Sequence, residues 1–176
     1  AISADSPGGT FPTLTGPDSV ENAIGNVGTG TIILNVPSGF IFDTNATAPT
    51  VRINGAASAG KNINNVGNGT SVAMTSVTTT QLTFTVTASS SGAACTLTWQ
   101  DVRVRPTAGT PLASGNLTVS GTASVVGLST NSNLGNLREV AGAATNLVIR
   151  TQPSATATAG VPFGQQPAIE VRDRFG

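Results

Sequence analysis

Residues 81–88 read Gln-Leu-Thr-Phe-Thr-Val-Thr-Ala, and this stretch decides the fold. Apolar Leu82, Phe84 and Val86 alternate with three threonines, which is the period-two pattern of a strand with one buried face and one hydroxylated face. The branched Cβ of threonine also favours an extended backbone. The same alternation recurs along the chain, whereas the 3.6-residue period of a helix is almost absent. The stretch therefore predicts an all-β protein.

Other strands are expected on both sides of this stretch. Turn-rich segments of Gly, Asn, Ser and Pro separate them, and strands at this spacing indicate an antiparallel β-sandwich, immunoglobulin-like or jelly-roll-like. A single helical turn is expected at residues 18–24, where Pro17 precedes it and Asp18 and Glu21 would cap its start. The further strands are predicted at 31–36, 49–54, 116–120, 123–128, 146–151 and 167–173.

The alternation changes parity between Met74 and Val77 and again in the middle of the chain. Cys95, Leu97 and Trp99 occupy odd positions, whereas Val102 and Val104 occupy even ones. One extra residue between the two runs would keep both sets inward, as a β-bulge does. The single cysteine excludes an internal disulfide and is expected to be buried as a small hydrophobe. The predicted core comprises Ile32, Leu34, Val36, Phe40, Phe42, Val51, Ile53, Leu82, Phe84, Val86, Leu97, Trp99, Val102 and Val104.

The composition narrows the class of protein. Of 176 residues only 9% are charged, with 8 basic and 8 acidic side chains, so no basic surface is available for nucleic acid. The hydrophobic content of 38% argues against disorder, and no apolar run approaches the roughly 20 residues of a membrane-spanning helix. The chain starts with Ala1, which fits a secreted protein whose signal peptide has been removed and equally a trimmed chain. We expect an extracellular or cell-surface location.

No residue pattern indicates catalysis. The chain has no His, and Lys61 is its only lysine, so a nucleophile would lack a base. Residues 55–62 (GAASAGKN) approach a phosphate-binding loop, but Asn62 stands where Ser or Thr would bind magnesium. A pair of carboxylates for glycoside hydrolysis, or a calcium site at Asp18 and Glu21, is a weaker interpretation. We expect no enzymatic activity, no cofactor and no metal.

The composition changes after residue 138. Residues 1–138 are expected to form the sandwich and residues 139–145 a flexible linker. Residues 146–176 then supply only two strands, whereas an immunoglobulin-like module needs about seven.

This last segment resembles a known kind of module. Residues 147–154 (LVIRTQPS), Ala159-Gly160 and residues 166–173 (QPAIEVRD) with Gly176 resemble the opening of the immunoglobulin-like tandem repeats of bacterial secreted and surface proteins. Residues 94–138 resemble the domain that precedes such repeats. The resemblance implies an extracellular, modular architecture and transfers no active-site residue.

The two C-terminal strands carry the candidate site residues. Leu147 and Ile149 share one face of their strand, as do Ile169 and Val171, and a two-stranded ribbon with a bare apolar face is marginal in water. Another copy could accept the strands by edge addition, and a head-to-tail contact would propagate into a filament. Neighbouring repeats, missing strands of a longer protein, or folding back of the ribbon are the alternatives.

The function expected from these features is that of a non-catalytic structural subunit. It would belong to an extracellular filament or surface assembly and be joined to its neighbours by strand addition. The alternative is a carbohydrate-binding or adhesive β-sandwich module of a large secreted protein, although sugar binding normally uses exposed aromatic rings and the chain has no Tyr.

Overall fold

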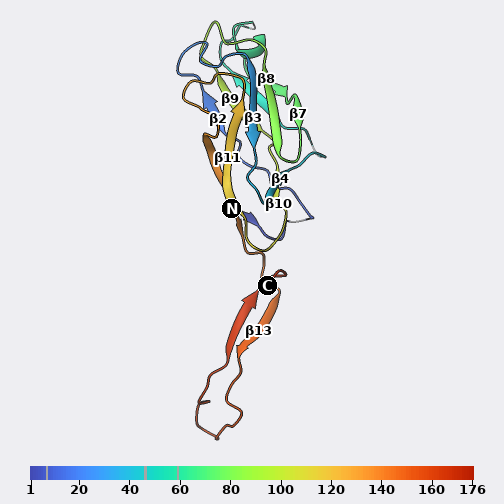
Figure 1. Ribbon diagram of the computed structural model, residues 1–176, viewed down its shortest axis with the longest axis vertical. Coiled ribbons are helices and arrows are strands. Elements are labelled where there is room, and N and C mark those ends of the chain that lie inside the picture. Colours follow the sequence, from blue (N-terminus) through green and yellow to red (C-terminus); the bar gives the residue numbers. More distant parts are fainter. Residues whose placement is uncertain (7, 46, 59) are drawn as a thin grey trace.

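The alternating segments form the strands of two sheets that lie face to face. The computed structural model describes residues 1–6, 8–45, 47–58 and 60–176 and is an antiparallel β-sandwich with a two-stranded extension (Figure 1). One large sheet has the order β1-β12-β11-β3-β8-β7 and the other has the order β2-β9-β5-β6. All neighbours in these sheets are antiparallel except β1 and β12.

Most strands are short, and two smaller pairs complete the molecule. β4 and β10 pair with each other, as do β13 and β14. The strands are β1 (Ile2–Ser3), β2 (Asp18–Val20), β3 (Gly30–Asn35), β4 (Phe40–Phe42), β5 (Thr50–Asn54), β6 (Thr70–Ala73), β7 (Ser76–Val77), β8 (Gln81–Val86), β9 (Thr96–Gln100), β10 (Val104–Pro106), β11 (Ser114–Gly121), β12 (Asn133–Val140), β13 (Asn146–Thr151) and β14 (Ala168–Arg172).

The core lies between the two large sheets and follows the predicted alternation. Leu82, Phe84 and Val86 of β8 are buried, and the threonines between them are only partly covered. Phe84 meets Trp99 of the opposite sheet edge-on, with ring centroids 6.5 Å apart and ring planes 71° apart. The rest of the predicted core is buried as well, except Val36, which is only partly buried.

The change of parity in the middle of the chain has the predicted effect. β9 ends at Gln100, and Asp101 adopts a left-handed backbone conformation with φ of 56°. This residue breaks the alternation, so Trp99 before it and Val102 after it are both buried. The sulfur of Cys95 is buried in the same core, as expected.

The helical turn predicted at residues 18–24 is wrong. Asp18–Val20 is strand β2, paired with β9. Glu21 is 4% exposed, and its carboxylate accepts hydrogen bonds from the backbone amides of Val27 (2.9 Å) and Cys95 (2.8 Å). It thus satisfies buried backbone donors between two distant segments and caps no helix. The helical structure in the described residues is a single 3-10 turn, Ile63–Asn65, within the loop between β5 and β6.

The strand predicted at 123–128 is also wrong, and the strand that pairs with β11 follows it instead. Residues 123–128 form a turn with a lone bridge between Val125 and Val27. Sequence alternation does not predict β12, because one of its inward positions carries a carboxylate. Glu139 is 1% exposed beside inward Leu137, and it accepts a hydrogen bond from the amide of Ala113 (2.7 Å). The sandwich therefore reaches Val140, and the linker expected at 139–145 begins at Ala141 instead.

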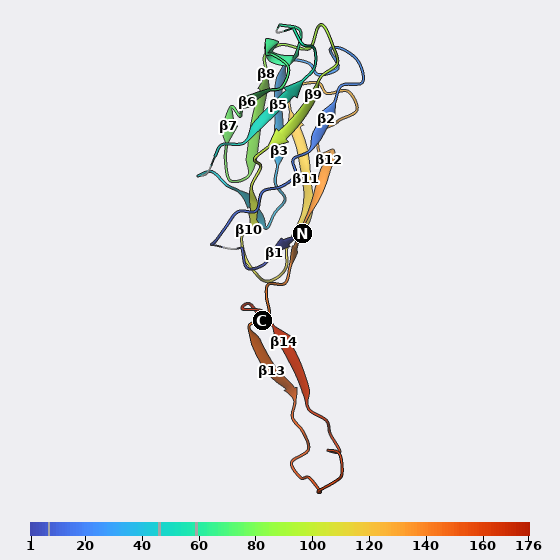
Figure 2. The ribbon, with the colours of Figure 1, turned by 180° about the vertical axis from the view of Figure 1, so that it is seen from behind.

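The β13–β14 pair, called the ribbon below, projects from one end of the sandwich. Both views show it beyond the end at which the N-terminus lies, with the 152–167 loop at its far tip (Figures 1 and 2). The ribbon is thus a separate two-stranded sheet, and its base is connected to the sandwich.

The buried carboxylate of Glu21 gives a stability prediction. Glu21→Ala leaves two buried amides without an acceptor, so the free energy of unfolding should fall by about 2–5 kcal/mol. Glu21→Gln retains one acceptor oxygen and should lose less. Urea unfolding, monitored by the fluorescence of Trp99, measures the free energy of unfolding of each variant. Asp18→Ala, at an exposed position of the same segment, is the control, and an equal effect of the two alanine variants would contradict this role of Glu21.

Candidate assembly surface

The register of the ribbon brings the four candidate residues onto one face. Leu147 lies opposite Val171, and Ile149 lies opposite Ile169. Directly opposed residues of an antiparallel pair point to the same side, so the four side chains form one continuous apolar face. Their exposed fractions are 72% for Leu147, 52% for Ile149, 61% for Ile169 and 61% for Val171. We call these four residues the ribbon face.

The opposite side of the ribbon is polar. Val148 lies opposite Glu170, and Asn146 lies opposite Arg172. The guanidinium of Arg172 donates a hydrogen bond to the Glu170 carboxylate at 2.9 Å, and this bond together with the positive charge lowers the pKa of Glu170. The ribbon is therefore amphipathic, with solvated charges on one side and bare aliphatic side chains on the other.

The ribbon has no second layer and no third strand among the described residues. β13 and β14 form a sheet of their own, so each has one edge of backbone groups without a strand partner. In the sandwich the edge strands β1, β2, β6 and β7 have only two to four residues. β1 pairs with β12 only at Glu139 and Val140, however, so the outer edge of residues 133–138 has no strand partner among the described residues. Short edge strands are a common protection against strand addition. The six residues of β13 and the five of β14 lack this protection.

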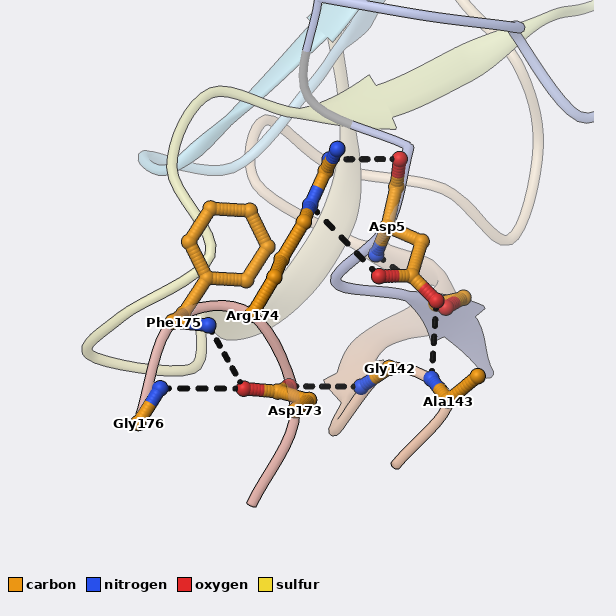
Figure 3. Close-up of polar contacts among 8 residues, drawn as sticks. Asp5, Gly142, Ala143, Asp173, Arg174, Phe175 and Gly176 are labelled. Carbon is orange, nitrogen blue, oxygen red and sulfur yellow. Dashed lines mark hydrogen bonds and ion pairs between the residues drawn. The ribbon is translucent and has the colours of Figure 1, made fainter. Parts of the chain in front are cut away.

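The base of the ribbon is fastened to the sandwich by two aspartates (Figure 3). Asp5, from the N-terminal segment, accepts a hydrogen bond from the amide of Ala143 (2.8 Å) and lies 3.5 Å from the guanidinium of Arg174. Arg174 also donates to the backbone carbonyl of Asp5 at 2.8 Å. Asp173 accepts hydrogen bonds from the amides of Gly142 (2.8 Å) and Phe175 (2.9 Å). We call these contacts the clamp.

An aromatic ring completes the clamp. Phe175 packs so closely on Gly109, in the loop between β10 and β11, that a side chain at residue 109 would collide with the ring. The guanidinium of Arg174 lies 4.6 Å from the centre of the same ring, within cation–π range. The segment after β14 therefore holds both the N-terminal segment and a loop of the sandwich. The linker predicted to be flexible is hydrogen-bonded at Gly142 and Ala143.

The residues considered for other chemistry lie apart from this surface. Lys61 is exposed in the loop between β5 and β6, as expected for a hairpin loop. Cys95 is buried, and burial raises the pKa of its thiol. Among the described residues no three His, Cys, Asp or Glu side chains gather in a way that could hold a metal ion. No helix in this part of the chain is long and apolar enough to cross a membrane.

Sequence reasoning found the ribbon face and missed the clamp. The four ribbon-face residues occupy alternate positions along two short strands, and this spacing can be read from the sequence alone. Asp5 and Arg174 are 169 residues apart in the chain, and no pattern in the sequence links them. The exposed Val161 and Phe163 in the tip loop were missed as well, because neither belongs to a periodic segment.

Fold and surface together define a class: an all-β sandwich that carries a clamped, amphipathic two-stranded ribbon at one end. No family model, curated protein or solved structure matches the chain.

The Asp173 carboxylate of the clamp should titrate at acid pH. The amide of Gly142, followed by those of Phe175 and Gly176, lowers the pKa of Asp173 below its ordinary value of 3.8. The contribution of these bonds is therefore complete above pH 3.8 and is lost as the pH falls through the lower, folded-state pKa. The amide chemical shifts of Gly142 and Phe175, measured by NMR as a function of pH, should change with a midpoint below pH 3.8. A midpoint at or above this value, or the same pH transition in the Asp173→Asn variant, would contradict the assignment.

Proposed function

We propose that the protein is a non-catalytic structural subunit of an extracellular or cell-surface assembly and that its ribbon joins it to a neighbouring subunit by β-strand addition. The observation that carries the proposal is the ribbon face, in which four aliphatic side chains are each more than half exposed. A two-stranded ribbon of this kind is marginally stable in water by itself.

Burial energetics support a partner. Covering a Leu, Ile or Val side chain completely contributes about 1.5–3 kcal/mol, so covering the exposed parts of the ribbon face contributes several kcal/mol. The unpaired edges of β13 and β14 add backbone hydrogen bonds when another strand is placed beside them. Apolar contact would supply the affinity and the edges would set the register.

The composition supports the extracellular setting and the structural role. Only 9% of the residues are charged, and most of the uncharged polar residues are Ser, Thr and Asn. The carbohydrate-binding alternative is less favoured. Sugar rings usually stack on exposed aromatic side chains, but the chain has no Tyr, and Trp99 is only 3% exposed.

Neighbouring positions of β13 test the proposal. Ile149→Asp places a charge on the ribbon face and should weaken self-association of the chain at least tenfold, because the carboxylate would have to be desolvated at the contact. Val148→Asp changes the adjacent residue, which is 37% exposed on the polar side, and should leave association within about threefold. Sedimentation velocity over a concentration series measures both.

Circular dichroism and Trp99 fluorescence serve as folding controls, because both variants lie outside the sandwich core. Equal effects of the two substitutions would contradict the role of the ribbon face. A wild-type chain that stays monomeric at every concentration would overturn strand addition between copies altogether.

A further inference from the structure

Residues 1–6, called the strap below, are anchored in the sandwich through strand β1. This strand pairs with Glu139 and Val140 of β12, and the amide of Ala4 donates a hydrogen bond to the carbonyl of Val140 at 2.8 Å. Ile2 is 4% exposed and belongs to the core of the sandwich, and Ala4 is completely buried. The strap therefore occupies a defined position at the edge of the large sheet.

The residue after Ala4 holds the base of the ribbon. The carboxylate of Asp5 accepts a hydrogen bond from the amide of Ala143 at 2.8 Å and lies 3.5 Å from the guanidinium of Arg174 (Figure 3). Gly142 lies so close to this carboxylate that a side chain there would collide with it. Asp5 thus contacts both the connection before β13 and the segment after β14. One side chain of the strap reaches both sides of the ribbon base.

The attachment of β1 to the sandwich is small. β1 has two residues, and an edge pairing of this length opens locally at less cost than the sheet unfolds. Gly8, which follows the strap, has a φ of 72° and open space where a Cβ would lie. A glycine in open space permits other backbone conformations, so the chain can turn there when β1 leaves β12.

We infer that the strap is a conformational switch that couples the docking of β1 to the orientation of the ribbon. With β1 docked on β12, Asp5 holds the ribbon base against the end of the sandwich. When β1 leaves, the contacts of Asp5 are lost and the base loosens. The same step opens the whole outer edge of β12 (Asn133–Val140). This inference concerns the single chain and does not rest on the proposed function.

The ribbon base has a second anchor that does not involve the strap. Phe175 packs on Gly109 of the sandwich, and Asp173 accepts a hydrogen bond from the amide of Gly142 at 2.8 Å. Both anchors hold the same short connection, because Gly142 and Ala143 are adjacent in the chain. Coupling between two sites is reciprocal, so loosening the second anchor should also weaken the docking of β1.

Ile2→Asp tests the switch from the sandwich side. The substitution places a carboxylate in an apolar position and should detach β1. Hydrogen exchange at the amides of Ala4 and Ala143 should then become at least tenfold faster. ¹⁵N relaxation should show one rotational correlation time for sandwich and ribbon in the wild type, and a shorter time for the ribbon amides in the variant.

Val77→Asp is the matched control. Val77 is a partly buried residue of β7, which is also a two-residue edge strand and lies at the opposite edge of the same sheet. This variant should loosen β7 and leave the ribbon amides with the relaxation of the wild type. All variants are measured at a concentration at which the chain is monomeric, so the result does not depend on self-association.

Gly109→Ala tests the coupling in the reverse direction. The added methyl group collides with the ring of Phe175, which should loosen the second anchor without touching the strap. Exchange at the amide of Ala4, which is bonded to Val140, should then become at least threefold faster. This arm decides the question even where Ile2→Asp prevents folding.

The outcomes are distinct. Faster exchange at Ala4 together with a loosened ribbon in Ile2→Asp, and faster exchange at Ala4 in Gly109→Ala, support the switch. A detached β1 with an unchanged ribbon would overturn it, as would a ribbon that Val77→Asp loosens equally. Unchanged exchange at Ala4 in Gly109→Ala would also overturn it. Failure of the chain to self-associate affects the proposed function alone.

Discussion

Every apolar sheet face in this protein needs a second layer, and the structure depends on how that need is met. Within residues 1–140 it is met internally: the inward residues of the two large sheets bury one another, with Phe84 against Trp99 near their middle. The same constraint applies to the ribbon, where Leu147 and Val171 face the solvent. The sandwich therefore buries its apolar faces within itself, whereas the apolar face of the ribbon is uncovered in this structure.

The clamp connects these two parts and gives the ribbon a direction. Asp5 and Asp173 accept hydrogen bonds from Ala143 and Gly142, so the short connection between β12 and β13 is held by carboxylates from both ends of the chain. Phe175 adds an apolar contact to the sandwich through Gly109. These contacts hold the base of the ribbon, so the ribbon face keeps its position relative to the end of the sandwich.

The open strand edges of the molecule lie in two places. The edge strands β1, β2, β6 and β7 have two to four residues, which limits strand addition beside them. The longer open edges of the described residues belong to the ribbon and to residues 133–138 of β12, because β1 pairs with β12 only at Glu139 and Val140.

Period-two alternation by itself determined the all-β class, the inward residues of β3, β5, β8 and β9, and the sidedness of the ribbon, because parity along a strand is a local property. It also determined the burial of both Trp99 and Val102 on either side of Asp101, since a change of parity is visible in sequence. The prediction from alternation failed where buried carboxylates interrupt the apolar pattern. Glu21 and Glu139 are buried, and each accepts hydrogen bonds from backbone amides of distant segments. Only the tertiary structure decided those positions, the strand β12 and the clamp between Asp5 and Arg174. Each depends on groups brought together by folding, and local sequence contains no record of such distances.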